Sequence, residues 1–149
     1  YEEMSRLREF EDVRAAYIVT PNHRHRRDTE AAAGAGLHVL CEKPMATNPD
    51  DCRAMMDACE RAERRLMIAY RVHYEPLNAK VREMIQKREH GQPHFVSFDT
   101  VQDVGKAPQY RLDRERNGGG SLFDLGIYPL NTTRYLLQEE PVEVSAMQW

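Results

Sequence analysis

The chain has 149 residues, with 21 Lys and Arg against 24 Asp and Glu and a formal net charge of −3. The two signs of charge are interspersed and no apolar run approaches the roughly 18 residues of a membrane span, so neither a nucleic-acid nor a membrane partner is expected. Three cysteines without a Cys-x-x-Cys pair are interpreted as reduced core residues, and no disulfide framework or metal site is predicted.

Strand-like and helical segments alternate in the first half of the chain, after a polar stretch over Tyr1–Asp12. The segments predicted as strands are Val13–Val19, His38–Cys41 and Leu66–Ala69. The helices expected between them are Asp28–Ala35, followed by a left-handed stop at Gly34 or Gly36, and Pro49 to about Arg64. Asn48 before Pro49 is typical of a helix cap. This order predicts a parallel sheet with right-handed crossovers.

The second half of the chain has a different pattern of predicted elements. It is predicted to contain, in order, the helix Pro76–Arg88, the strand His94–Val101, the polar loop Gln102–Gly120, the helix Asp124–Leu137 and the last strand Val142–Trp149. The alternation in His94–Val101 is typical of a sheet with one solvated face. We expect a domain boundary near residues 70–74.

Polar clusters follow each of the three predicted parallel strands. They are Thr20-Pro21-Asn22, Glu42-Lys43-Pro44 and Tyr70-Arg71. Because ligands of parallel α/β sheets bind outside the carboxyl ends of the strands, these clusters are expected to line one crevice. The pattern predicts a binding site at this edge of the sheet.

At Glu42-Lys43-Pro44 the sequence resembles the glucose–fructose oxidoreductase / inositol dehydrogenase superfamily (Gfo/Idh/MocA), and its glucose–fructose oxidoreductase-like branch most closely. The other stretches that carry the resemblance are Tyr17–His23, Ala69–Pro76, Arg111-Leu112-Asp113 and Gly118–Gly120 running into Asp124–Tyr128. They occur in the family's order and at family-like spacing, and they cover nearly the whole chain from about Val13.

The resemblance implies an α/β fold class with two parts. Residues 1–72 would be the C-terminal half of a Rossmann parallel sheet that binds NADP or NAD. Residues 73–149 would be the first part of an α+β domain with a largely antiparallel open sheet, through which such proteins form homo-oligomers. The chain is therefore expected to be a fragment that is inactive alone.

The phosphate-binding Gly-x-Gly-x-x-Gly of the family is missing from this sequence. Gly34-Ala35-Gly36 ends a predicted helix where the fingerprint must begin one, so it is no substitute. Without that loop the pyrophosphate lacks a helix N-terminus, and weak or absent cofactor binding is expected. A smaller departure is Tyr110, where related sequences often carry Trp beside the substrate.

Three residues are implied to be catalytic. Tyr128 matches the family's acid/base position, and Lys43 is the cation that would lower the phenol's pKa from its usual value near ~10. Asp124, one helical turn before Tyr128, would bind a substrate hydroxyl. The residues alone leave alternatives open: an aromatic on a helix, a solvated lysine and a helix N-cap. Pro129 favours a helix start after Asp124.

The cofactor contacts predicted from the strand-end clusters and the resemblance are Thr20, Pro21, Asn22, His25, Glu42, Lys43 and Arg71. A simple Thr-Pro-Asn turn, a surface acid at 42 and an ordinary ion pair at 71 are the alternatives. His25 is also compatible with a satisfied histidine that has no ligand. The resemblance further implies a cis peptide between Lys43 and Pro44, and the glycines 118–120 are interpreted as a hinge or a close approach to ligand.

The function predicted from the sequence is an NAD(P)-dependent oxidoreductase that transfers hydride between a sugar or cyclic polyol and the nicotinamide. A catalytically inactive, dinucleotide-binding regulator of the same superfamily is the alternative, and an incompletely folded fragment is a third. A cytoplasmic location is expected, or a periplasmic one if a leader is missing.

Overall fold

The computed structural model describes residues 12–105 and 109–147, so the stretch 1–11 and the end of the last predicted strand lie outside the described residues. The chain forms two compact units. Unit 1 contains the described residues up to 70 together with residues 102–127, and unit 2 contains residues 71–101 and 128–147. The loop that follows residue 101 therefore belongs with the first part of the chain.

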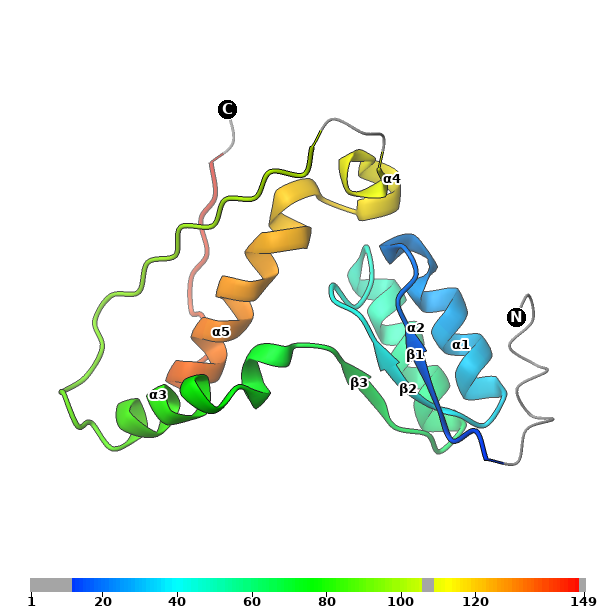
Figure 1. Ribbon diagram of the computed structural model, residues 1–149, viewed down its shortest axis with the longest axis horizontal. Helices are drawn as coiled ribbons and strands as arrows, with labels where there is room; N and C mark the ends of the chain where they lie inside the picture. The colour runs from blue at the N-terminus through cyan, green and yellow to red at the C-terminus, as the bar shows by residue number, and fades with distance from the viewer. Residues whose placement is uncertain (1–11, 106–108, 148–149) are drawn as a thin grey trace. The chain divides into compact units, whose positions relative to one another are not determined.

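The sheet of unit 1 has three parallel strands in the order β1 (Ala15–Ile18), β2 (His38–Cys41) and β3 (Leu66–Ile68). Figure 1 shows them running in the same direction. The three predicted strands are thus confirmed, with ends trimmed by up to two residues. A parallel sheet with helical connections is consistent with a Rossmann-like fold.

Two helices lie side by side and pack on one face of this sheet (Figure 1): α1 (His25–Gly34) and α2 (Pro49–Arg61). Their small side chains allow close packing against the alternate strand residues that point inward. The resulting core consists of Ile18, Ala32, Ala33, Val39, Cys41, Ala46, Met55 and Cys59. Strand residues of the opposite face, such as Tyr17 and Met67, are largely exposed.

The ends of both helices follow from local sequence chemistry. Gly36, with a φ of +82°, stops the chain after α1 in the left-handed region, as expected. Asn48 caps α2, because its side-chain oxygen accepts a hydrogen bond from the Asp51 amide at 2.8 Å. Pro49 occupies the first helical position, where no amide proton is needed.

The rest of unit 1 is short and irregular. A 3₁₀ turn covers Tyr110–Leu112, α4 covers Arg114–Asn117, and a π-helical turn covers Leu122–Gly126. The last helix, α5, begins only at Ile127 and runs to Leu137. Asp124 therefore lies inside the π turn and is not the cap of the helix, so the N-cap alternative for this residue is wrong.

Unit 2 is built from α3 (Pro76–Gln86) and α5. Its most ordered contact is a stack of aromatic rings, in which His73 and Tyr135 lie 4.3 Å apart at 13°. The Tyr135 hydroxyl donates to the His73 carbonyl at 3.1 Å, and the Arg82 guanidinium lies 4.9 Å from the Tyr135 ring centre. This stack connects the segment before α3 to both helices.

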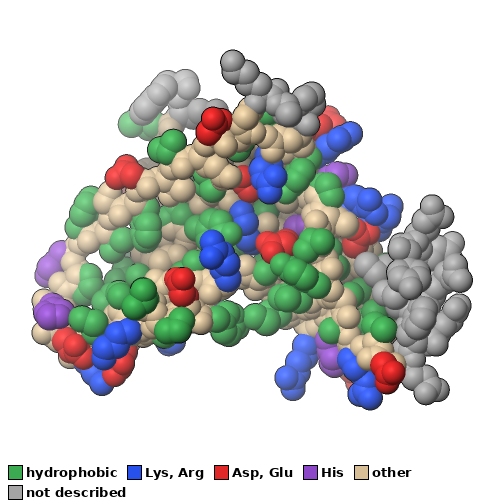
Figure 2. All heavy atoms as spheres, viewed as in Figure 1, with side chains coloured by type: hydrophobic (Ala, Val, Ile, Leu, Met, Phe, Trp, Pro, Cys, Tyr) green, Lys and Arg blue, Asp and Glu red, His purple; other side chains and the backbone are tan. Residues whose placement is uncertain are grey.

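The antiparallel sheet expected in the second half is not observed. His94–Val101 and the described residues 142–147 are not strands, although both were predicted to be. Strands persist through ladders with neighbours, and neither segment has a partner strand among the described residues. Their apolar side chains stay exposed, Val142 and Phe95 among them, and Figure 2 shows hydrophobic side chains at the surface of this part of the chain.

Within residues 12–105 and 109–147, no helix combines the length and apolar composition required to cross a membrane.

Candidate active site

Two of the predicted polar clusters meet at the carboxyl edge of the unit 1 sheet. His25, which is fully buried, joins them: its Nδ1 lies 2.9 Å from the Pro44 carbonyl oxygen and its Nε2 lies 2.8 Å from the Thr20 carbonyl oxygen. Both ring nitrogens are therefore occupied by the protein. The ring holds the two turns together, in agreement with the satisfied histidine that the sequence left open, and its predicted contact with a cofactor stays a prediction.

The first cluster, which follows β1, is also held from within. The Thr20 hydroxyl donates to Asp28 Oδ2 at 2.8 Å. Asn22 is buried, and its Nδ2 donates to the Asn117 carbonyl oxygen at 3.0 Å. These contacts fasten the turn after β1 to α1 and to the glycine-rich segment at 117–120. Two of the side chains predicted to touch a cofactor, Thr20 and Asn22, thus make hydrogen bonds within the protein.

Glu42 has an oriented carboxylate at the end of β2. The Tyr17 hydroxyl donates to Oε1, and the Lys43 amide donates to Oε2 at 3.2 Å. Tyr17 comes from the neighbouring strand β1, so the pair links two adjacent strands. The carboxylate is only partly buried and has further lone pairs that can accept hydrogen bonds from hydroxyl groups.

Lys43 is brought to Asp124 although 81 positions separate the two residues. Its ammonium lies 3.2 Å from Asp124 Oδ1 and also donates to the Asp124 carbonyl oxygen. The side chains are 11% and 15% exposed, so water screens this pair only partly. The peptide between Lys43 and Pro44 is cis, which confirms the expectation from the resemblance.

A second cation contacts the same carboxylate. Arg111 Nε lies 3.3 Å from Asp124 Oδ2, whereas the 3.2 Å contact of Lys43 is with Oδ1. The Arg111 guanidinium also lies 4.9 Å from the centre of the Tyr110 ring, a cation–π distance. Asp124 therefore bridges two positive charges, and the three side chains carry a formal net charge of +1.

Tyr128 and Arg71 belong to unit 2, where they line one cavity of about 620 Å³. Tyr74, Glu75 and Thr100 contribute further polar groups to its wall. Tyr128 is the second residue of α5, just before Pro129 in the first turn. The cavity is large enough for a small polar ligand. The predicted meeting of Tyr128 with Lys43 stays a prediction.

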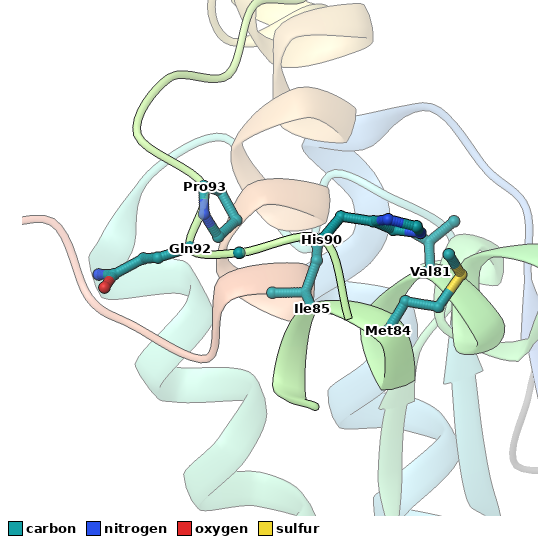
Figure 3. Close-up of a pocket in the computed structure, with 7 residues that line it drawn as sticks. Val81, Met84, Ile85, His90, Gln92 and Pro93 are labelled. Atoms are coloured by element: carbon teal, nitrogen blue, oxygen red, sulfur yellow. The ribbon is translucent and has the colours of Figure 1, made fainter. Parts of the chain in front are cut away.

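A smaller hollow of about 250 Å³ lies at the end of α3. Figure 3 shows that Val81, Met84 and Ile85 of the helix face it together with His90 and Pro93 from the turn that follows. Its wall is mostly apolar and carries no carboxylate or Lys side chain. Because it lacks convergent polar groups, this hollow is a gap in the packing of unit 2 and no candidate for the chemistry.

Metal and thiol chemistry find no support in the described part of the chain. No group of three or more His, Cys, Asp or Glu residues is arranged to hold a metal ion there. All three cysteines are free, as expected. Burial raises the pKa of the Cys41 thiol to about 12, so this group stays a neutral thiol near pH 7.

The sequence missed two residues that the structure adds to the site. Arg111 was noted only as part of the Arg-Leu-Asp stretch, and Asn117 was not singled out. Asn117 is fully buried, and Gly118 packs against Thr47 so closely that an added Cβ would lie 2.9 Å from the Thr47 Cβ. No local pattern in the sequence indicated this fixed turn, because the burial of Asn117 becomes visible only in the fold.

Comparison with known proteins matches both parts of the chain to one family. The GFO/IDH/MocA model, described as an oxidoreductase family with an NAD-binding Rossmann fold, matches residues 1–70. The model of the GFO/IDH/MocA C-terminal domain matches residues 78–149.

Individual relatives are longer than this chain. A D-xylose 1-dehydrogenase (NADP⁺) of Haloarcula marismortui is 41% identical over 87% of this chain and 37% of its own length. A 1,5-anhydro-D-fructose reductase of Ensifer adhaerens is 34% identical over 91% of this chain and 41% of its own. The crystal structure of the aldose-aldose oxidoreductase of Caulobacter crescentus, complexed with glycerol, has a TM-score of 0.84 and 42% identity, covering 95% of this chain and 42% of that one. The chain thus spans about two fifths of these proteins.

Proposed function

Because this chain belongs to the GFO/IDH/MocA oxidoreductase family, we propose that it is part of an NAD(P)-dependent oxidoreductase that acts on a sugar or cyclic polyol. The observation that carries the proposal is the Lys43–Asp124 pair, largely shielded from water at the carboxyl end of β2. Ligands of parallel α/β sheets bind at that edge. A charged pair at this place is suited to a polar substrate.

The residues at the sheet edge fit one end of a nicotinamide dinucleotide. The Glu42 carboxylate, oriented by Tyr17, is suited to accept hydrogen bonds from ribose hydroxyls. The described residues provide no glycine-rich helix start for the pyrophosphate, so they fit the nicotinamide end and not the phosphate end. NADP and NAD remain the two candidate cofactors. When bound, the nicotinamide supplies the acceptor for the hydride.

The chemistry at the substrate is the oxidation of an alcohol. The C–H bond of the carbinol carbon breaks with its electron pair leaving as hydride, and the O–H proton leaves to a base as the carbonyl forms. We assign the base to Tyr128 and the stabilisation of negative charge on the substrate oxygen to the Lys43 ammonium. Asp124 holds Lys43 in place and accepts a hydrogen bond from a substrate hydroxyl.

A neutral sugar is the favoured substrate class. The cavity beside Tyr128 is lined by both a cation, Arg71, and a carboxylate, Glu75, together with the hydroxyl of Thr100. Such a wall offers donors and acceptors to several hydroxyl groups without an excess of either charge. The relatives named above support aldoses, and D-xylose is the first sugar to test.

The test is the reduction of NADP⁺ and NAD⁺ by a panel of aldoses and inositols, followed at the nicotinamide absorbance, with the full-length protein that carries this chain. Lys43→Ala and Tyr128→Phe are each expected to lower kcat by about 10²–10⁴-fold. Lys80→Ala is the matched control, since Lys80 pairs with Glu83 on the exposed side of α3.

Turnover by Lys43→Ala and Tyr128→Phe at the wild-type rate would reject these roles. Dinucleotide binding without turnover of any sugar would reject the dehydrogenase proposal and favour the inactive regulator, for which no described residue gives a reason.

A further inference from the structure

A third charged residue shares the carboxylate that holds Lys43. Asp124 presents its two oxygens to different cations: Oδ1 lies 3.2 Å from Lys43 Nζ, and Oδ2 lies 3.3 Å from Arg111 Nε. All three residues belong to unit 1. Arg111 reaches the carboxylate from the 3₁₀ turn at Tyr110–Leu112, nearly 70 positions after the strand end that carries Lys43.

The arrangement determines how far the Asp124 carboxylate neutralises the charge of Lys43. A carboxylate shared by two cations neutralises neither of them fully, whereas a carboxylate paired with one ammonium can neutralise it. With Arg111 the group of three has a formal net charge of +1, and without Arg111 the remaining pair has none. At these distances and with side chains 11% and 15% exposed, that difference is only partly screened by water.

The position of Arg111 is itself restrained. Its guanidinium lies over the Tyr110 ring, 4.9 Å from the centre, which orients the planar group toward one side. Its side chain is 41% exposed, so solvent reaches it and an ordinary surface pair with a free aspartate would be worth little. Here the partner is an aspartate with 15% exposure that is already bound to a lysine, so the contact has a consequence for the lysine.

We propose that Arg111 is a positioning residue that keeps the group formed by Lys43, Asp124 and Arg111 net positive, so that the Lys43 ammonium can stabilise negative charge on the substrate oxygen. The inference rests on the proposed function for its kinetic consequence, but the charge sharing itself does not. Without Arg111, Asp124 would turn both oxygens toward Lys43, and the ammonium would be neutralised by its neighbour.

The kinetic test compares Arg111→Met with Arg111→Lys and with Arg116→Met as the matched control. Arg116 lies five residues further along, and its Nε pairs with Asp113 Oδ2 at 3.3 Å instead of with Asp124. We expect Arg111→Met to lower kcat about tenfold while the sugar KM changes less than about twofold. Arg111→Lys should restore most of the rate, and Arg116→Met should match the wild type.

A double-mutant cycle separates action through Asp124 from a general structural role. In an Asp124→Asn background, Arg111→Met should cause no further loss, because the charge that Arg111 shares is gone. Losses that multiply in the double variant would overturn the proposal. Equal thermal unfolding of the single variants excludes misfolding as the cause, and Arg111→Lys serves if Arg111→Met does not fold.

A second measurement does not depend on turnover. Acylation of Lys43 by acetic anhydride, followed by mass spectrometry, requires the neutral amine. A carboxylate that pairs with Lys43 alone binds the ammonium more strongly, so labelling should slow several-fold in Arg111→Met and not in Arg116→Met. Unchanged labelling would overturn the inference. If the wild type oxidises no sugar, the proposed function fails, and the labelling result still decides the role of Arg111.

Discussion

Unit 1 and unit 2 differ in what covers their side chains. In unit 1 the sheet and its two helices enclose a continuous apolar core, and even buried polar groups such as His25 and Asn22 have partners. In unit 2 none of the described residues is buried, and Leu77 and Val81 of α3 stay exposed. The contrast lies in burial and not in helix content, since both units contain two well-formed helices or more.

The comparison shows which contacts of the site are supported by a packed unit and which depend on local contacts. Lys43 and Asp124 both belong to unit 1, in which the Asn22–Asn117 hydrogen bond ties the segment before Asp124 to the turn after β1, so their contact follows from the folding of unit 1. The cavity beside Tyr128 is lined by helices with no core of their own, and its walls therefore rest on local contacts such as the His73–Tyr135 stack. The four experiments below test this difference.

The largest effect is expected from the centre of the unit 1 core. Met55 is fully buried, and Met55→Ala should lower the free energy of unfolding by about 2–5 kcal/mol through lost burial and a cavity. Leu77→Ala on α3 is the control, because Leu77 is 76% exposed and should cost less than about 0.5 kcal/mol. Urea unfolding measures both, and equal losses would remove the contrast between the units.

The next effect concerns the bridge between the two strand-end turns. His25→Leu keeps the bulk but removes the ring nitrogens beside the Thr20 and Pro44 carbonyl oxygens, so at least one of these oxygens loses its donor, which should cost roughly 1–3 kcal/mol. His90→Leu, at an exposed position of unit 2, should leave stability nearly unchanged. Amide exchange near residues 42–45 should also rise in His25→Leu. Normal protection there would mean that the ring does not hold the site.

The third effect is a loss of stability in alkali. The Cys41 thiol has a pKa raised from 9.0 to about 12 by burial, so the unfolded chain releases its proton first as the pH rises. This contribution is complete below pH 9, and above it stability should fall by at most about 1.4 kcal/mol per pH unit until about pH 12. Cys41→Val should lack this loss in urea titrations at pH 8–11, and an identical slope in both proteins would contradict it.

The smallest effect distinguishes the starts of α2 and α3. Asn48 caps α2 with its side chain, whereas Glu75 at the start of α3 makes no such hydrogen bond. Asn48→Ala should therefore cost about 1 kcal/mol, and Glu75→Ala should cost less. Urea unfolding with amide exchange in each helix checks both changes. A greater loss from Glu75→Ala would show that the cap is not what secures α2.

Much of unit 1 could be predicted from the sequence, because its elements are defined by local signals. Apolar runs predicted the strands to within two residues, and Asn48 before Pro49 predicted the start of α2. The cis peptide before Pro44 came from the resemblance instead, since no local pattern specifies it. Sequence also identified Lys43 and Asp124, although not the contact between them.

The remainder depends on partners that local patterns do not reveal. His94–Val101 has the alternation of a strand, but alternation describes faces and says nothing about a neighbouring strand to pair with. Arg111 resembles any loop arginine until the fold brings Asp124 beside it. Thr20 and Asn22, both predicted to contact the cofactor, make hydrogen bonds within the protein. Short polar side chains at strand ends can bond either to the protein or to a ligand, so the sequence does not distinguish the two roles.

The turn at residue 118 restricts which sequences can keep this site. Gly118 has a φ of +98°, and an added Cβ would lie 3.1 Å from the Thr47 Cα as well as close to its side chain. Backbone cannot yield as a flexible side chain does, so any other residue would move the turn away from Thr47 in the segment after β2. The absence of a side chain at residue 118 thus determines where the segment that carries Arg111 and Asp124 can lie. Even an alanine at this position would displace residues of the site that it does not itself contact.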